Sequence, residues 1–142
     1  PTAHGVFEKK VENAGVEHLV EIDSAGTGGW HIGKKPDSRA ISAAKQRGYE
    51  LTHLRARQAT QRDFGQFDLI LAMDESNLYD LKSLKPDNFP GTLDLFLSYG
   101  SQTEYQEVPD PYYGGNKGFD LVLDLIEDAC DGLLESILQN QK

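Results

Sequence analysis

The sequence contains very little cysteine, since Cys130 is the single one among 142 residues. One cysteine cannot form a disulfide within the chain, so we expect a protein of the reducing cytoplasm. Apolar runs are all too short to cross a membrane, and residues 1–4 do not resemble a secretory signal. Histidine and cysteine nowhere cluster with the spacing of metal ligands, so the sequence predicts neither a metal nor another cofactor.

Arginine is absent after Arg62, and all five arginines lie between Arg39 and Arg62. The chain carries 14 basic and 23 acidic residues, which gives a formal net charge of −9. Such an excess of negative charge disfavours nucleic acid and anionic membranes as partners of the whole surface. The basic region could attract an anionic substrate, or it could be a set of solvated helix faces. The composition leaves both interpretations open.

Hydrophobic periodicity alternates between helical and strand-like along the chain. Helices are expected at residues 2–14, 36–48, 76–84 and 119–138, with a short one from Thr60 toward Phe67. Strands are expected at residues 19–23, 49–51, 68–74 and 92–97. The third strand is apolar between its terminal acids, as in a strand buried on both faces of a parallel sheet. We therefore predict a single domain, residues 1–142, with a three-layer α/β/α fold and a central parallel sheet.

Asp110 lies between two prolines and is followed by Tyr112 and Tyr113. Proline fixes its own φ, and Pro111 also disfavours a helical backbone at Asp110, so a stiff loop presents the carboxylate. The adjacent rings would narrow the space around it and exclude water, which suits a general acid. The same residue types are common in surface turns, and taken alone this segment favours a turn.

Three polar segments follow predicted strands, at residues 24–27, at residues 74–77 and around Asp110. Because ligands bind at the carboxyl ends of parallel strands, these segments should converge at one edge of the sheet. The first helix also offers its N-terminus there, and the free N–H groups of a helix N-terminus bind anions. Together with Trp30 and the two tyrosines, this arrangement predicts a site for a phosphate ester.

An ordered set of motifs resembles the low-molecular-weight protein tyrosine phosphatase family over nearly the whole chain. The motifs are residues 23–27 (DSAGT), 36–39 (PDSR), 53 with 56–58 (H and ARQ), 63–64 (DF), 67–68 (FD), 73–77 (MDESN) and 110–114 (DPYYG). The resemblance implies the fold of that family and hydrolysis of phosphotyrosine through a phosphocysteine intermediate. Asp110 matches the acid that protonates the tyrosyl leaving group.

The resemblance also implies roles for other residues. Trp30, Tyr112 and Tyr113 match the aromatic walls that stack on the substrate ring. Ser24 and His53 match two polar residues that steady the phosphate-binding loop of the family. Asp74 matches an acid of the family that supports the site without touching the substrate.

The nucleophile of that family is a cysteine in a Cys-x5-Arg loop, and this sequence contains no such loop. Since the sequence begins at the proline that follows the loop, we expect a chain truncated at its N-terminus, without its first strand, and inactive as written. Cys130 cannot substitute, because it lies on the apolar stripe of the last predicted helix and Ser136 stands where the arginine would be needed. Loss of a central strand leaves unpaired edges, so an oligomer is expected if another chain replaces it.

The resemblance implies a phosphotyrosine protein as substrate, and the likeness to bacterial members adds a tyrosine kinase as a partner. Three functions follow from these observations. The first is a phosphatase whose nucleophile lies outside this chain, and the second is a catalytically inactive phosphatase-like module that binds aromatic or phosphorylated partners. The third, a thiol-dependent arsenate reductase of the same fold, needs further cysteines and is set aside.

Overall fold

The computed structural model describes residues 1–29, 32–111 and 115–140. Its α-helices are α1 (Thr2–Asn13), α2 (Ser38–Gln46), α3 (Asp63–Gln66), α4 (Glu75–Leu84) and α5 (Gly115–Asn140). This part of the chain also contains two 3-10 helices and two strands, which are η1 (Glu17–Leu19), η2 (Phe96–Tyr99), β1 (Leu69–Ala72) and β2 (Thr92–Leu95). The order of these elements follows the predicted alternation, with the exceptions described below.

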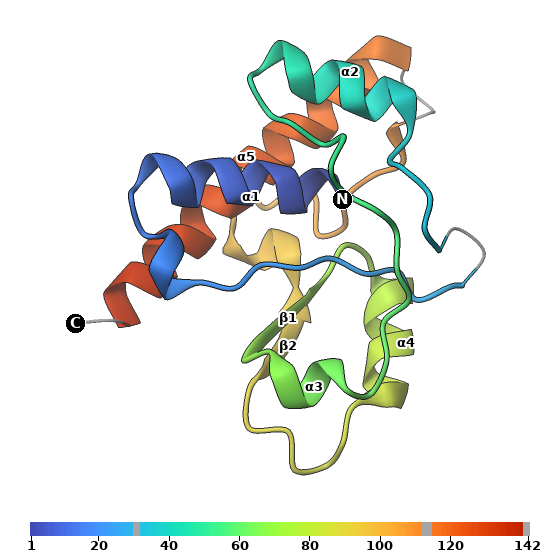
Figure 1. Ribbon diagram of the computed structural model, residues 1–142, viewed down its shortest axis with the longest axis vertical. Helices are drawn as coiled ribbons and strands as arrows, with labels where there is room; N and C mark the ends of the chain where they lie inside the picture. Colours follow the sequence, from blue (N-terminus) through green and yellow to red (C-terminus); the bar gives the residue numbers. More distant parts are fainter. Residues whose placement is uncertain (30–31, 112–114, 141–142) are drawn as a thin grey trace.

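Strands β1 and β2 pair in parallel, with Leu69 opposite Thr92 and Ala72 opposite Leu95. Helices α3 and α4 lie on one side of this pair, and α1, α2 and α5 lie on the other (Figure 1). The architecture is therefore the predicted three-layer α/β/α arrangement around a parallel sheet.

Apolar side chains form two clusters, one on each face of β1. The larger cluster joins α1, α2 and α5, and Leu123 of α5 is among its most deeply buried members. Leu69 and Leu71 pack against this larger cluster, whereas Ile70 and Ala72 pack in the smaller one with α3 and α4. Successive side chains of a strand point to opposite faces, so β1 contributes to both cores, as its continuous apolar run predicts.

Two aspartates begin helices by accepting backbone N–H groups. Asp37 Oδ1 accepts the N–H of Arg39 at 2.8 Å before α2, and Asp74 Oδ1 accepts the N–H of Asn77 at 2.7 Å before α4. Each bond satisfies a donor that the first helical turn leaves unpaired. Helix α1 ends as predicted just before Gly15, whose φ of 71° suits a residue without a Cβ.

Two of the predicted strands are not strands in the structure. Val20 has an extended backbone (φ −136°, ψ 131°) and residues 20–24 run nearly straight, but they form no strand ladder (Figure 1). Residues 49–51 are irregular, with Tyr49 and Leu51 buried in the larger cluster. Both predictions are wrong because alternating burial arises wherever a segment packs on helices, whereas a strand also needs a neighbouring backbone.

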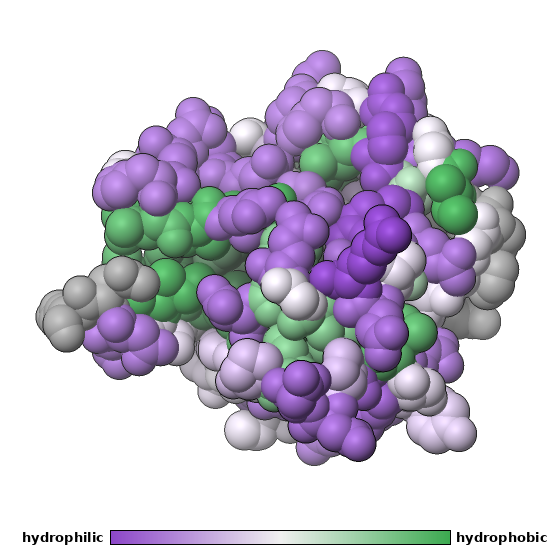
Figure 2. Space-filling model, turned by 60° about the horizontal axis from the view of Figure 1, so that its bottom comes forward, coloured by the Kyte–Doolittle hydropathy of each residue, from purple (hydrophilic) through white to green (hydrophobic). Residues whose placement is uncertain are grey.

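Hydrophilic side chains cover most of the face shown in Figure 2, with apolar patches between them. Among the described residues, the large apolar side chains with the greatest exposure are Leu19, Ile32 and Tyr79, which belong to three separate segments. In the same part of the chain, no helix combines the length and the apolar character that crossing a membrane requires.

Candidate functional site

Asp110 and Asp74 line the same hollow, which has a volume of about 610 Å³ and is completed by residues 104–109. The backbone N–H of Val108 donates to the carbonyl oxygen of Met73 at 2.8 Å. Because Met73 directly follows β1, this bond fixes the Asp110 loop at the carboxyl end of the strand. Asp110 is exposed there, so its carboxyl group is accessible from solvent.

The N-terminus of α4 also meets the segment at residues 24–27. Asn77 Nδ2 donates to Thr27 Oγ1 at 3.2 Å. Gly26 lies in turn against residues 57–59. Its N–H donates to the carbonyl oxygen of Arg57 at 2.8 Å, and Gly26 and Gln58 form an isolated parallel β-bridge. The three segments that follow predicted strands therefore converge on one edge of the fold.

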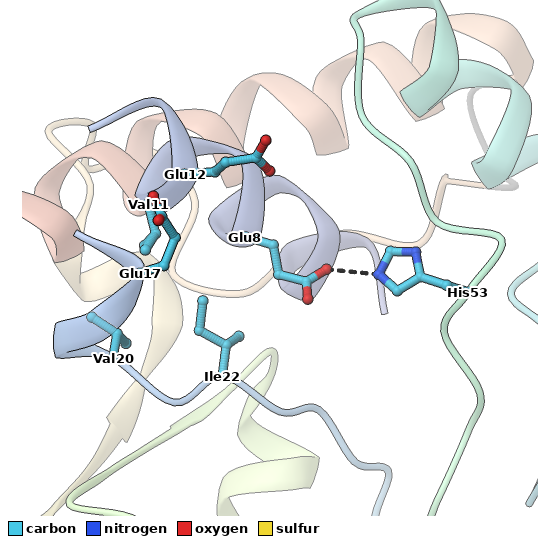
Figure 3. A pocket seen from close by; sticks show the side chains of 7 residues that line it. All are labelled: Glu8, Val11, Glu12, Glu17, Val20, Ile22 and His53. Carbon is cyan, nitrogen blue, oxygen red and sulfur yellow. Dashed lines mark hydrogen bonds and ion pairs between the residues drawn. The ribbon is translucent and has the colours of Figure 1, made fainter. Parts of the chain in front are cut away.

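A second hollow, of about 360 Å³, lies between α1 and the extended residues 20–22 (Figure 3). Its lining consists of Glu8, Val11, Glu12, Glu17, Val20, Ile22 and His53. The His53 side chain is 52% exposed and its Nε2 lies 2.9 Å from Glu8 Oε1. His53 thus lines a different hollow from Asp110, and two side chains of α1, Glu8 and His4, connect it to Ser24.

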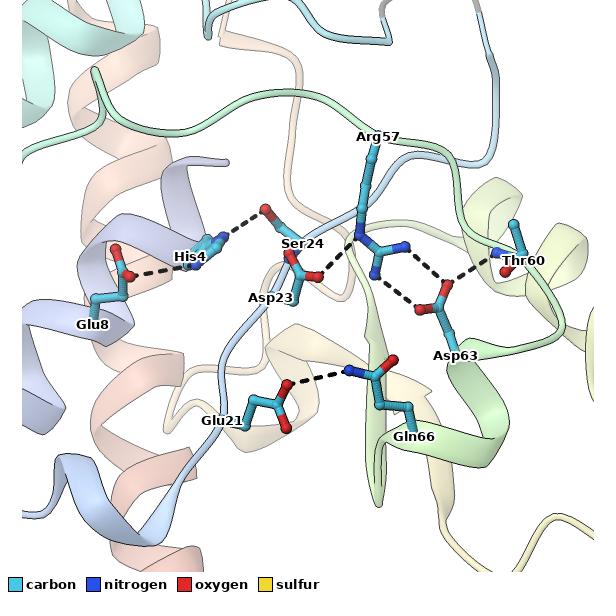
Figure 4. Close-up of polar contacts among 9 residues, drawn as sticks. All are labelled: His4, Glu8, Glu21, Asp23, Ser24, Arg57, Thr60, Asp63 and Gln66. Carbon is cyan, nitrogen blue, oxygen red and sulfur yellow. Dashed lines mark hydrogen bonds and ion pairs between the residues drawn. The ribbon is translucent and has the colours of Figure 1, made fainter.

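A row of polar side chains connects Ser24 to His53 through α1; Figure 4 shows its part from Ser24 to Glu8, and Figure 3 shows the contact of Glu8 with His53. His4 Nδ1 lies 2.7 Å from Ser24 Oγ, and His4 Nε2 lies 3.5 Å from Glu8 Oε2. Sequence analysis missed His4 and Glu8; the available signal was their spacing of four residues on the first predicted helix. Burial lowers the pKa of His4, and the combined effects of neighbouring charges leave it below its ordinary value.

Arg57 holds two acids on different segments. Its Nη1 and Nη2 donate to Asp63 at 3.1 and 2.9 Å, and its Nε donates to Asp23 Oδ2 at 3.0 Å. Asp63 Oδ2 also accepts the N–H of Thr60 at 2.9 Å, which is one half of a capping box at the start of the short predicted helix. Burial raises the pKa of Asp63, but the bonds from Arg57 and Thr60 outweigh it and leave that pKa below its ordinary value.

Side chains, rather than a backbone ladder, hold the extended residues 20–24 in place (Figure 4). Gln66 Nε2 donates to Glu21 Oε1 at 3.2 Å. Arg57 binds Asp23 and His4 binds Ser24 as described above. The segment is therefore fixed at three points along its length.

Cys130 is fully buried in the larger apolar cluster, with its Sγ 4.0 Å from the carbonyl oxygen of Ala3. Burial raises the pKa of this thiol to about 12. A protonated, inaccessible thiol is a poor nucleophile, in agreement with the prediction of a structural cysteine.

The three aromatic residues expected in the substrate cleft, Trp30, Tyr112 and Tyr113, lie outside the described residues. Their contact with substrate stays a prediction, as does the role of Asp110 as the acid.

The sequence model of the family described as "Low molecular weight phosphotyrosine protein phosphatase" matches residues 1–142. A low molecular weight protein-tyrosine-phosphatase of Streptomyces coelicolor is 43% identical over 140 residues, which cover 96% of this chain and 85% of that protein. A low molecular weight phosphotyrosine protein phosphatase of Schizosaccharomyces pombe is 42% identical, over 96% of this chain and 88% of that protein.

Among solved structures, a protein tyrosine phosphatase of Entamoeba histolytica, crystallised with Hepes in its active site, is similar over 100% of this chain and 90% of that one. The TM-score of this comparison is 0.93 at 36% sequence identity. Sequence, motif order and fold agree along the whole chain, and the chain belongs to the low molecular weight phosphotyrosine protein phosphatase family.

Proposed function

We propose that this chain is the acid-bearing part of a protein tyrosine phosphatase, and that a segment outside residues 1–142 supplies its cysteine nucleophile. The observation that carries the proposal is the position of Asp110. Its carboxyl group is exposed beside Asp74, on a loop that Val108 fixes to the end of β1. A general acid requires such an accessible and fixed position at the edge where ligands of parallel sheets bind.

The edge of β1 supports a nucleophile segment that enters as a strand. Among the described residues, β1 pairs with β2 on one edge and with no strand on the other. Residues 20–24 are extended and are held by side chains, without a backbone ladder of their own. A strand between β1 and this segment would satisfy both sets of backbone groups.

Such a strand would lead to the N-terminus of α1, where free N–H groups bind an anion and favour a thiolate. In the proposed reaction this thiolate attacks phosphorus, and the bond between phosphorus and the tyrosyl oxygen breaks. Asp110 gives its proton to that oxygen. Water then attacks the phosphocysteine, Asp110 accepts a proton from the water, and inorganic phosphate leaves.

The remaining residues receive supporting roles in this proposal. Trp30, Tyr112 and Tyr113 hold the substrate ring, while Ser24 and His53 steady the phosphate-binding loop. Asp74 orients the first turn of α4, because its carboxylate accepts the N–H of Asn77. We expect phosphotyrosine proteins as substrates, a tyrosine kinase among the partners, and a cytoplasmic location. An oligomer is expected where another chain supplies the strand.

One observation favours a second candidate, an inactive phosphatase-like binding module. The only thiol in the sequence is Cys130, which is buried with a pKa raised to about 12. If no other segment joins this chain, an acid and a cleft remain without a nucleophile. Such a module would bind phosphotyrosine peptides without hydrolysing them.

The deciding experiment joins a strand and Cys-x5-Arg loop to Pro1 and measures hydrolysis of aryl phosphates. We expect activity, and we expect Asp110→Asn to slow it by about 10²–10⁴-fold, most strongly for leaving groups of high pKa. Asp87→Asn, which changes an exposed acid in the turn after α4, is the matched control and should leave the rate unchanged. Full turnover by the Asp110→Asn variant would overturn the assignment of the acid.

The binding module is tested on the chain as it stands, by calorimetry with phosphotyrosine peptides. Binding that weakens in Trp30→Ala, with no activity after the loop is joined, would favour the module over the enzyme.

A further inference from the structure

His4 has a polar partner at each ring nitrogen, a hydrogen-bonded hydroxyl at Nδ1 and a carboxylate at ion-pair distance from Nε2. Ser24 Oγ lies 2.7 Å from Nδ1, and the Glu8 carboxylate lies 3.5 Å from Nε2 (Figure 4). The His4 side chain is 10% exposed, so bulk water has little access to its ring. Which of its ring nitrogens carry a proton therefore determines whether each partner donates or accepts a hydrogen bond.

In a neutral imidazole, one nitrogen donates and the other accepts. A carboxylate can only accept, so Glu8 favours the form of His4 with its proton on Nε2. Nδ1 is then the acceptor, and the Ser24 hydroxyl must donate its proton to it. When His4 is protonated, both nitrogens donate, Ser24 Oγ accepts from Nδ1, and the hydroxyl proton of Ser24 turns to another acceptor.

We propose that His4 is a positioning residue that sets the direction of the Ser24 hydroxyl. Neutral His4 accepts a hydrogen bond from the Ser24 hydroxyl at Nδ1. Charged His4 cannot accept, so the Ser24 O–H donates to another acceptor. The hydroxyl thus changes from a donor to His4 Nδ1 into an acceptor from it, and its own proton becomes available to another acceptor.

Charged groups from each neighbouring segment set the pH of this change. Burial has the largest effect and lowers the pKa of His4, and the charge of His53 lowers it as well. Glu8 on the same helix and Asp23 beside Ser24 raise it. The pKa of His4 therefore lies below the ordinary histidine value, and the change occurs on the acidic side of that value.

The consequence for catalysis rests on the proposed function. Ser24 is bonded to the first turn of α1, and the N-terminus of that helix is the proposed anion site. Below the pKa of His4, Ser24 would have a hydroxyl proton available for hydrogen bonding on that side of the fold. The proposed phosphatase should therefore depend on Ser24 more strongly in acidic than in neutral solution.

The switch is tested on the chain as it exists, by long-range ¹H–¹⁵N NMR of the histidine rings between about pH 5 and about pH 8. Above its midpoint, His4 should carry its proton on Nε2, with Nδ1 unprotonated. A proton on Nδ1 above the midpoint would overturn the proposal, because Ser24 would then accept in both states.

Glu8→Gln supplies a second test. It should lower the midpoint of His4, since the Glu8 charge raises the pKa of that ring. Glu12→Gln changes an exposed carboxylate one turn further along α1 and should leave the midpoint unchanged. An unchanged midpoint in Glu8→Gln would mean that Glu8 does not face His4 in solution, and the proposal would fail.

The catalytic consequence is measured separately, in the enzyme with its joined loop. The ratio of the parent rate to the Ser24→Ala rate should rise as pH falls through the His4 midpoint. A ratio independent of pH would overturn the catalytic role of the released hydroxyl. An enzyme without any activity would instead count against the proposed function, while the NMR result would still decide the switch.

Discussion

Gly132 of α5 lies against the backbone of Tyr99, so closely that a Cβ on the glycine would stand 1.8 Å from the tyrosine carbonyl oxygen. This approach lets α5 pack directly on η2. We predict that Gly132→Ala lowers the free energy of unfolding by about 1–3 kcal/mol, because helix and turn must move apart. Urea denaturation followed by circular dichroism measures the change.

The control for this prediction is Gly65→Ala in α3. Apart from its sequence neighbours and the backbone of its own helix, no described heavy atom lies within 4 Å of a Cβ at Gly65, so the added methyl group meets open space. Alanine also favours a helix by up to about 1 kcal/mol over glycine. Equal destabilisation in both variants would show that the close approach at Gly132 is not the cause.

Asp63 gives a prediction with a defined pH dependence. Its carboxylate accepts two bonds from Arg57 and one from the N–H of Thr60, and its side chain is 13% exposed. We expect Asp63→Asn to cost about 1–3 kcal/mol at neutral pH, because Arg57 loses a charged partner. Chemical denaturation at a series of pH values measures this cost.

The sign follows from the lowered pKa of Asp63 in the folded chain. The unfolded chain binds the proton more readily, so the charge stabilises the fold above a pH of about 4 and this contribution is lost as pH falls further. The difference between parent and variant should be constant near neutral pH and narrow in acid. The exposed acid Asp87, changed to asparagine, should show no such difference, and a gap that widens in acid would contradict the mechanism.

Cys130 should be almost unreactive in the folded chain. Burial raises the pKa of its thiol from 9.0 to about 12. At a given pH below both values, far less thiolate is present than in an exposed cysteine, and the buried sulfur is also inaccessible. Labelling with a thiol reagent should be fast in urea and slow in buffer; fast labelling of the folded chain would require a new search for the nucleophile.

Local chemistry accounts for much of what the sequence predicts. Asp37 and Asp74 act as helix caps, and the apolar run at residues 68–74 contains a strand with burial on both sides. The predicted strand at 92–97 is shorter, because Phe96 begins the 3-10 helix η2. Helix α5 starts at Gly115, earlier than its apolar stripe indicates, since a first turn needs no buried side chain.

Long-range polar contacts were beyond the sequence patterns. Ser24 and His4 are 20 residues apart, and Asp23 and Arg57 are 34 residues apart, so the local spacing of residues predicts neither pair. Family resemblance singled out Ser24 and His53 without the two residues of α1 that connect them. Such partners become visible only when the fold brings their segments together.

The alternation along β1 makes the fold sensitive to sliding. Leu69 and Leu71 face one core, and Ile70 and Ala72 face the other. A shift of β1 by a single residue against β2 would send each pair of side chains into the wrong core. The pairing of this four-residue strand therefore determines how both helical layers pack on the sheet. It also determines the positions of Asp74 and Asp110 at the end of β1.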